Sequence, residues 1–497
     1  MADSDDFDEF GGASKKDLNK ASKMQDYGHD EPLEYDSVMS NFFVRVAPGE
    51  GDEFAAVKPW LGAIKEPANH PKNSKKAPDE QLEIDWVYGY RSEEARMNCQ
   101  FNELGQAVYP TAALGVVFDY RTMKQQYFGG GKTGFGGRKQ KDVGKDGHTD
   151  DVTSLCMSNS RKMVASGQNG QMPQIFVWDA ATCQVVSSKV LPKGCRLVTA
   201  IGFSKSDKYI CASDAAEKIT CHVFEIEGGK APIASVTINM KIVHLAWSPN
   251  NEMMFATAGK DHLALCTLDG KKIDKKLGKG KGGGVPSMCA AAWVNDPNHA
   301  SVILTGGADG QIYQWKDDTV TKSYPLCEKG AVQSIACRVD KAAGGEIVLA
   351  GGNDKTLTVF KFDGALKKLW TIACDAAPRS VDMFGGQILL GLKNGSICEL
   401  AWTADGSAHP RAVMTSHCDG ETWGLEVCHT DSGELRVITS GDDNRLLAYN
   451  PRTYQVLAEG QVNDKAKVKK LKAARGGASS MSSQPSACQS RCVAFCP

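Results

Sequence analysis

The sequence predicts an all-β fold, a seven-bladed β-propeller, on three observations. Short apolar strands alternate with turns rich in Gly, Asp and Asn, and this unit recurs seven times. The copies lie about 40 to 50 residues apart, near the ~40–45 residues of one propeller blade. Glycine makes up 51 of 497 residues without a collagen period, which indicates many tight turns. Since one four-stranded blade cannot cover its own apolar faces, we expect the copies to pack radially around an axis.

Each copy has an apolar strand, a turn, and an alternating strand that ends near an aromatic residue. The signature of a WD40-type blade is intact once, from Gly147-His148 to Trp178-Asp179. In that copy, His148, Ser166 and Trp178 occupy positions for a blade-stabilising hydrogen-bond network, which we interpret as structural and not catalytic. The copies predict a propeller over residues 148–460. They are Met163–Asp179, Tyr209–Phe224, Phe255–Cys266, Ile303–Trp315, Val348–Phe360, Ile388–Leu400 and Val437–Tyr449.

The chain before the propeller divides into three parts. Residues 1–53 are predicted to be an acidic flexible arm, because the first 40 carry eleven acidic side chains against four basic ones. Residues 54–128 hold an aromatic segment and a partial blade, since residues 106–127 match the outer part of a repeat. Residues 129–147 form a Gly/Lys-rich insert.

Two further parts follow the propeller. Residues 461–487 are a basic linker, and residues 488–497 match the start of a blade, as in His244–Pro249. The sequence stops where the next turn should begin. We therefore expect the start of a second propeller, truncated here or continued in a longer protein. A native stop codon after Pro497, with no further repeats in any transcript, would refute this.

Composition excludes several classes of protein. The net charge of −1 gives no bulk attraction to nucleic acid or membrane. The 17 cysteines are an odd number spread from Cys99 to Cys496, so no disulfide framework is predicted. They form no CxxC pair, and Cys488, Cys492 and Cys496 lack partner ligands, so no metal site is predicted. The N-terminus lacks the apolar stretch of a secretory signal, and no run approaches the ~18 apolar residues of a membrane span. We predict a cytoplasmic chain without cofactors.

No motif of catalysis is complete. Gly129–Gly134 superficially suggests a phosphate-binding loop, but Gln126 stands where the P-loop needs its first glycine, and no apolar helix follows. Gly278–Gly284 fails similarly. There is no Gly-x-Ser-x-Gly elbow, no His-Glu-x-x-His and no supported carboxylate pair. The chain is not predicted to be an enzyme.

An aromatic segment precedes the repeats. Leu82–Arg91 reads Leu-Glu-Ile-Asp-Trp-Val-Tyr-Gly-Tyr-Arg, and Ala95-Arg-Met-Asn98 follows. This segment resembles the HELP motif of the echinoderm microtubule-associated protein-like family, and the stretches Val57–Ile64 and Gly147–Val152 also resemble that family. The resemblance covers roughly residues 54–497. It implies tandem propellers that meet at the HELP segment, and binding to tubulin or microtubules.

Trp86, Tyr88 and Tyr90 alternate with smaller residues, so their rings should face one side of an extended segment. We expect them to pack between propellers and not to contact a partner directly, because aromatic rings bury large areas. The same packing role is expected for Gly89, Arg91, Arg96 and Asn98. The two arginines should bind carbonyls or carboxylates where the propellers meet. Two features depart from the family. No heptad repeat precedes the segment, and the arm is acidic where that of some members is basic.

Three stretches carry strong positive charge: residues 129–147 (+3), 271–281 (+5) and 465–475 (+6). As loops projecting from a rigid disc, they could steer and hold the acidic surface of tubulin. The alternative is a solvated linker, since exposed charge alone contributes little affinity. The candidate tubulin-binding residues are Lys132, Arg138, Lys139, Lys141, Lys271, Lys272, Lys275, Lys276, Lys279 and Lys281.

We therefore predict a non-catalytic protein of the cytoskeleton, in a cilium or flagellum. Its expected partners are microtubules and other axonemal proteins. The ciliary location follows from the absent coiled coil, which leaves a bare propeller suited to a regular lattice. One alternative is a general WD40 scaffold for soluble complexes without tubulin contact. Another is an RNA-associated propeller that uses the lysine loops.

Overall fold

The computed structural model describes residues 83–129, 147–170, 173–280, 284–340, 344–430 and 432–461, together with Asn69. The predicted acidic arm, most of the Gly/Lys-rich insert, the linker beyond Gln461 and the predicted start of a further blade lie outside these residues. The described residues form eight four-stranded sheets and one short 3-10 helix, η2 (Pro297–His299). The all-β prediction is confirmed. No helix in the described ranges is long and apolar enough to cross a membrane.

Each sheet is antiparallel and contains four strands that are consecutive in the sequence. The first sheet comprises β1 (Gln100–Phe101), β2 (Ala107–Thr111), β3 (Leu114–Asp119) and β4 (Lys124–Phe128). The next comprises β5 (Val152–Met157), β6 (Met163–Gln168), β7 (Gln174–Asp179) and β8 (Val185–Val190). The third comprises β9 (Val198–Phe203), β10 (Tyr209–Asp214), β11 (Thr220–Glu225) and β12 (Ala234–Thr237). The fourth comprises β13 (Ile242–Trp247), β14 (Met254–Gly259), β15 (His262–Asp269) and β16 (Lys272–Leu277).

The remaining four sheets follow the same pattern. The fifth comprises β17 (Met288–Trp293), β18 (Val302–Gly307), β19 (Gln311–Lys316) and β20 (Thr319–Pro325). The sixth comprises β21 (Val332–Asp340), β22 (Gly345–Gly352), β23 (Thr356–Phe362) and β24 (Leu366–Ala373). The seventh comprises β25 (Pro378–Phe384), β26 (Gln387–Leu392), β27 (Ile397–Ala401) and β28 (Arg411–Met414). The eighth comprises β29 (Thr422–His429), β30 (Leu435–Gly441), β31 (Arg445–Tyr449) and β32 (Val456–Gln461).

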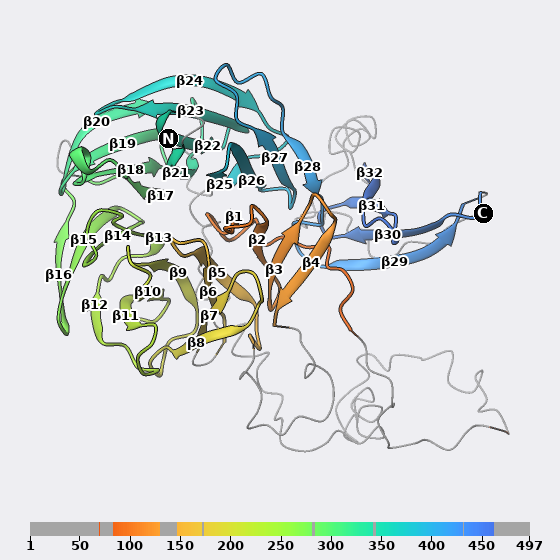
Figure 1. Cartoon of the computed structure of the whole chain (residues 1–497), viewed down its shortest axis with the longest axis horizontal. Coiled ribbons are helices and arrows are strands. Elements are labelled where there is room, and N and C mark those ends of the chain that lie inside the picture. The colour runs from red at the N-terminus through yellow and green to blue at the C-terminus, as the bar shows by residue number, and fades with distance from the viewer. Residues whose placement is uncertain are drawn as a thin grey trace, which may run out of the picture. The chain divides into compact units, whose positions relative to one another are not determined.

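Seven of these sheets form a closed ring (Figure 1). From β5 to β25, the first strand of each sheet packs against the first strand of the next, so these strands surround the centre. Strand β1 packs against both β5 and β25, and the sheet β1–β4 therefore closes the ring between its two ends. The outer strands β16, β20 and β24 are mostly exposed at the rim.

The core of the ring lies between successive sheets. Leu304 and Ile312 of the fifth sheet pack with Ile335 and Val348 of the sixth, and all four side chains are fully buried. Glycine allows this close approach at some positions. A Cβ atom on Gly167 would lie 2.5 Å from the Val198 side chain of the neighbouring sheet, closer than carbon atoms tolerate.

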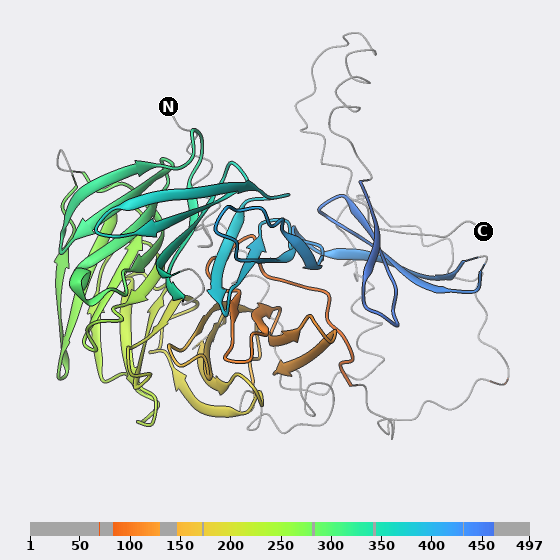
Figure 2. The ribbon, with the colours of Figure 1, turned by 45° about the horizontal axis from the view of Figure 1, so that its top comes forward.

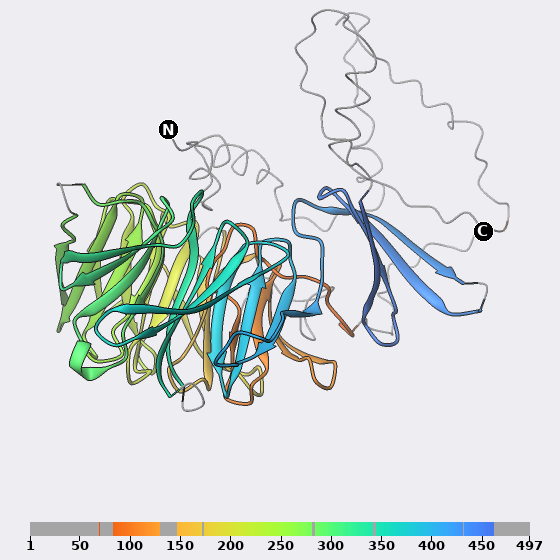
Figure 3. The same cartoon turned by 90° about the horizontal axis from the view of Figure 1, so that it is seen from above.

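The boundaries of the ring differ from the predicted ones. Repeat counting assigned seven blades to residues 148–460 and a partial blade to residues 106–127. The structure builds a complete sheet from Gln100 to Phe128 and ends the ring at Met414. The predicted seventh blade, β29–β32, lies beside the ring (Figures 2 and 3). In the first blade, Ala112 and Ala113 join β2 to β3, so this blade lacks the turn rich in Gly, Asp and Asn by which the other copies are recognised.

The eighth sheet exposes an apolar face. Trp423, Leu425 and Val427 are 46%, 66% and 50% exposed, whereas the equivalent strand β25 of the ring is almost entirely buried. These three residues alternate along β29 and therefore share one side of the sheet. In the ring, a neighbouring blade covers the first strand of each sheet. A further blade would cover β29 in the same way.

A buried carboxylate contributes to closure of the ring, whose two ends share no strand in any described sheet. The backbone N–H of Phe101 in β1 donates to Asp382 of β25 over 2.9 Å. Arg161, in the turn after β5, donates to both carboxylate oxygens over 2.8 and 3.1 Å, and Arg338 of β21 donates over 2.7 Å. Burial disfavours the charge of Asp382, but the two guanidinium groups outweigh it and hold its pKa well below the usual range. One carboxylate thus connects four sheets.

Candidate functional site

The aromatic segment that resembles the HELP motif, called the HELP segment below and described over residues 83–98, crosses the closure of the ring. The N–H of Arg91 donates to the carbonyl of Pro110 in β2, over 3.0 Å. On the other side, the hydroxyl of Ser92 donates to the Lys393 carbonyl and the N–H of Met97 donates to the Arg379 carbonyl, each over 3.0 Å. The segment therefore connects the first sheet of the ring to the seventh.

Trp86 and Tyr88 pack against the eighth sheet. The Trp86 ring stacks on Tyr454, with centroids 4.2 Å apart and planes 5° apart, and it meets Phe118 of β3 edge-on at 5.5 Å. The Tyr88 ring lies 4.1 Å from that of Tyr449 in β31. Burial, and next the neighbouring Tyr449, raise the pKa of Tyr88, so its hydroxyl stays protonated at neutral pH. These two side chains join the ring to the sheet β29–β32.

Tyr90 faces a different neighbour from Trp86 and Tyr88. It is 4% exposed, meets Tyr109 of β2 edge-on at 5.9 Å, and donates its hydroxyl hydrogen to Asn98 over 2.8 Å. A Cβ atom on Gly391 of β26 would lie 2.1 Å from the Tyr90 oxygen, and one on Gly89 would lie 2.2 Å from the Thr111 hydroxyl. Tyr90 thus packs inside the ring closure and not against the eighth sheet.

The two arginines of the HELP segment bind groups of the ring. Arg91 pairs with Glu94 and donates to Asp151 over 3.0 Å. Arg96 donates to the side-chain amide oxygen of Gln333 in β21 over 2.8 Å. The side-chain nitrogen of Asn98 donates to the Arg91 carbonyl over 2.7 Å, which fixes the bend of the segment.

The three residues of the intact blade signature form one network. His148 Nε2 lies 2.6 Å from the Ser166 hydroxyl, and the Trp178 indole N–H donates to that hydroxyl over 3.0 Å. His148 Nδ1 lies 2.9 Å from the Gln168 side-chain oxygen. Burial lowers the pKa of His148 to about 4, so the imidazole is neutral at pH 7 and accepts from Ser166 while donating to Gln168. This network joins strands within the blade.

The predicted lysine loop at residues 271–281 is largely a strand. Lys271 lies in the turn after β15, whereas Lys272, Lys275 and Lys276 belong to β16. β16 pairs with β15 from Asp269–Lys272 to Ala264–Leu277. The prediction of a loop was wrong because the lysines concealed a strand that is anchored by one buried residue, Ile273.

The lysines of β16 divide between two faces. Lys272 and Lys276 share a face with Asp274, which pairs with Lys272 over 2.7 Å. Lys275 is on the other face and donates to the Thr237 carbonyl over 2.6 Å. Lys279 pairs with Asp318 over 3.2 Å. Among the described residues, no ion pair involves Lys271 or Lys276. The other candidates, Lys132, Arg138, Lys139, Lys141 and Lys281, lie outside the described residues.

Sequence reasoning missed the partners of the HELP segment aromatic residues and of the residues that close the ring. Tyr449 was noted only as a strand end, and Tyr454 and Asp382 were not considered. Tyr449 and Tyr454 meet Tyr88 and Trp86, and Asp382 meets Phe101 and Arg161, across more than 200 residues of sequence, and no local pattern reports such contacts. A clustering of aromatic residues at 449–454 was the one available signal for the contact with the HELP segment.

Comparisons with known proteins match the described architecture. Residues 146–385 match a family model described as the first β-propeller of echinoderm microtubule-associated protein. Residues 77–116 match the model of the HELP motif. The first match runs from β5 into β25, and the second covers the HELP segment and the start of the first sheet.

Three curated relatives are similar to this chain over most of its length. The ciliary WD repeat-containing protein ctxp80 of Euplotoides octocarinatus is 37% identical over 454 residues, 90% of this chain and 60% of that protein. Echinoderm microtubule-associated protein-like 1 of Rattus norvegicus is 25% identical over 78% of this chain and 46% of its own length. Echinoderm microtubule-associated protein-like 2 of Mus musculus is 23% identical over 78% and 57%, respectively. The chain thus spans between about half and three fifths of these relatives.

Proposed function

Since the chain belongs to the echinoderm microtubule-associated protein-like family, whose HELP motif and first β-propeller it carries, we propose that it binds microtubules and has no catalytic role. The observation that carries this proposal is the similarity to a ciliary WD repeat protein over 90% of the chain and to microtubule-associated proteins over 78%. The name of the ciliary relative supports a location in a cilium or flagellum, and within it we propose the axoneme, where microtubules form the lattice.

The rim strand β16 supports a contact with an acidic partner. Lys271 and Lys276 are exposed, and no described acidic group neutralises them. Lysines on an outer strand also prevent unwanted pairing with other strands, which is the structural alternative for this position. A tubulin surface rich in carboxylates would gain favourable electrostatic contacts here, and such contacts raise the association rate more than the affinity.

Co-sedimentation of the full chain with microtubules tests the proposal. We expect pelleting that resists nuclease and weakens as the salt concentration rises, since exposed charges are screened. Failure to pellet at low salt would overturn the proposal and favour a scaffold for soluble complexes. Pelleting that disappears with nuclease would instead favour an RNA-associated propeller.

A pair of charge-reversed variants tests the surface. Lys271→Glu/Lys276→Glu changes the β16 rim, and Lys367→Glu/Lys368→Glu provides the control on β24, another exposed outer strand. We expect the first variant to bind microtubules at least about 10-fold more weakly and the second to bind like the wild type. Equal binding by both variants would show that microtubules do not contact β16.

Location is tested by imaging the tagged full-length protein in ciliated cells. Signal along the axoneme that survives detergent extraction is expected, because a lattice-bound protein does not wash out. A diffuse signal that is lost on extraction would remove the axonemal part of the proposal.

A further inference from the structure

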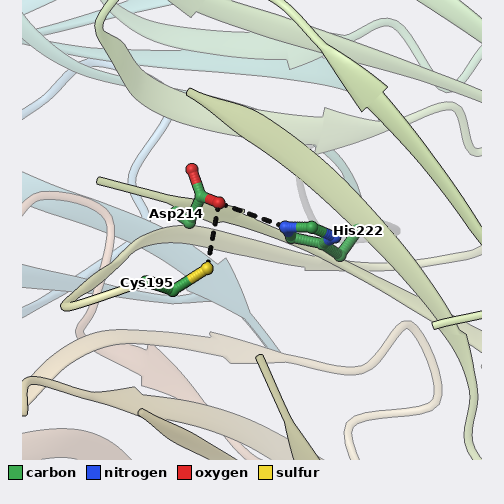
Figure 4. Close-up of side chains that lie close together, drawn as sticks. All are labelled: Cys195, Asp214 and His222. Atoms are coloured by element: carbon green, nitrogen blue, oxygen red, sulfur yellow. Dashed lines mark hydrogen bonds and ion pairs between the residues drawn. The ribbon is translucent and has the colours of Figure 1, made fainter. Parts of the chain in front are cut away.

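Three side chains of different chemistry meet inside the third sheet (Figure 4). Cys195 lies in the connection from β8 to β9, Asp214 ends β10, and His222 lies in β11. They are 5%, 2% and 5% exposed. The register of β10 shifts between Ser213 and Asp214, and an irregularity of this kind redirects a side chain.

The potential ligand atoms of these residues converge. The Cys195 sulfur lies 3.2 Å from Asp214 Oδ2, and His222 Nε2 lies 3.1 Å from the same oxygen. All three ligand atoms lie within 4.8 Å of one another. A thiol, an imidazole and a carboxylate thus meet from β10, β11 and the connection that precedes the third sheet.

The second oxygen of Asp214 and the second ring nitrogen of His222 form hydrogen bonds with other residues. Asp214 Oδ1 accepts from the Thr220 N–H over 2.9 Å, and His222 Nδ1 lies 2.9 Å from the Ser235 hydroxyl. Metal-binding histidines usually have their second ring nitrogen fixed in this way, which orients the ring and selects the tautomer. Ser235 is exposed on the outer strand β12, so the cluster lies just below the surface.

We propose that Cys195, Asp214 and His222 bind a divalent transition-metal ion of the zinc type. Donor atoms around a tetrahedral zinc ion are about 3.3–3.5 Å apart, given bond lengths of about 2.0–2.3 Å. Both measured separations from Asp214 Oδ2 are within a few tenths of an ångström of that spacing. Thiolate and imidazole ligands select zinc, cobalt or copper over calcium and magnesium. Three protein ligands leave the fourth position for water.

Metal binding changes which atoms of Cys195 and His222 carry hydrogen. Without metal, the Cys195 thiol and the His222 Nε2–H both donate to Asp214 Oδ2. When the ion binds, the thiol hydrogen leaves and the imidazole hydrogen moves from Nε2 to Nδ1, where the Ser235 hydroxyl accepts it. Nε2 is then available to the metal. Each ion bound therefore releases one proton to solvent, and metal affinity should rise with pH.

A second group of the same residue types provides a matched comparison. In the eighth sheet, His417 and Cys418 lie beside Asp443, with His417 Nδ1 2.9 Å from the carboxylate. There the other ring nitrogen lies 2.9 Å from the Thr439 hydroxyl, and Arg445 approaches the carboxylate to 3.9 Å. Because a guanidinium already supplies the positive charge, this group is not expected to bind a metal.

The test uses the full chain, stripped of metal with a chelator and titrated with Co²⁺. We expect one equivalent to bind with the near-ultraviolet absorption of a thiolate–cobalt bond and the visible bands of tetrahedral cobalt. Cys195→Ser should abolish the thiolate absorption of this site, whereas Cys418→Ser should retain it. The comparison separates this site from the similar group around Cys418.

Ser235→Ala keeps the test independent of folding, because its side chain is exposed. Loss of this partner should weaken Zn²⁺ binding by about 10- to 100-fold, while circular dichroism remains unchanged. Zinc should also raise the melting temperature of the wild type but not of Cys195→Ser. The proposal is overturned if the wild type shows no thiolate–cobalt absorption, or if wild type and Cys195→Ser give the same titration. The cluster would then be a hydrogen-bond network only.

Discussion

Replacement of Asp382 by asparagine should destabilise the closure of the ring. The carboxylate is fully buried, and its partners Arg161 and Arg338 are 14% and 29% exposed. Breaking a buried ion pair costs about 3–5 kcal/mol, and we expect about 3 kcal/mol because both guanidinium groups keep some contact with water. A ring of roughly 300 residues has an unfolding entropy of about 0.6 kcal/mol/K, so the melting temperature should fall by about 5 °C.

Thermal and urea denaturation followed by circular dichroism measure this loss. The control is Asp274→Asn, whose partner Lys272 lies at 2.7 Å, but with side chains 64% and 76% exposed. An exposed pair contributes little to stability, so this variant should melt within about 2 °C of the wild type. If both variants melt at the wild-type temperature, Asp382 does not hold the ring closed.

The pH dependence gives a second measurement on the same residue. The pKa of Asp382 is lower in the folded state than the value of about 3.9 expected in the unfolded chain. Its contribution is therefore complete above about pH 4 and is lost as the pH falls toward the folded-state pKa. The difference in stability between wild type and Asp382→Asn should shrink below about pH 4. A constant difference down to acid unfolding would contradict this account.

Three further predictions concern the HELP segment and the intact blade. Trp86→Ala removes the indole stacked on Tyr454, so amide hydrogen exchange in β29–β32 should accelerate about 10-fold, while exchange in the seven sheets of the propeller is unchanged. Equal acceleration in all sheets would contradict the role of Trp86 in holding β29–β32 to the propeller. Ser166→Ala leaves the His148 and Trp178 nitrogens without their partner, and urea denaturation should show a loss of about 1–3 kcal/mol, against less than about 0.5 kcal/mol for the exposed Ser432→Ala. Burial lowers the pKa of His148 to about 4, so its NMR titration should occur near that pH; because the unfolded state binds the proton first, stability should fall between about pH 6.5 and 4, and titration near 6.5 would contradict burial.

Local patterns sufficed for most of the strands. The pairs Met163–Gln168 with Gln174–Asp179, and Val302–Gly307 with Gln311–Lys316, lie where apolar runs flank turns rich in Gly, Asp and Asn. Such patterns depend on neighbouring residues and can be read from sequence. They failed at β16, where exposed lysines outnumber the buried residue that anchors the strand.

The candidate sites were less accessible to sequence reasoning. The aromatic residues of the HELP segment could be identified from their spacing, but the separate neighbours of Tyr88 and Tyr90 could not. Cys195, Asp214 and His222 gave no motif, since three segments and a register shift bring them together.

The sequence by itself determined the all-β class, the repeated blade and the HELP segment, because alternation, turn residues and short motifs are properties of adjacent residues. Only the tertiary structure decided which seven sheets close the ring and which sheet lies beside it. Closure rests on contacts such as that between Cys99 and Ser380, which are separated by 281 positions in the chain. The free energy of such a contact depends on which sheets can bury their apolar faces together, and no local pattern contains that information.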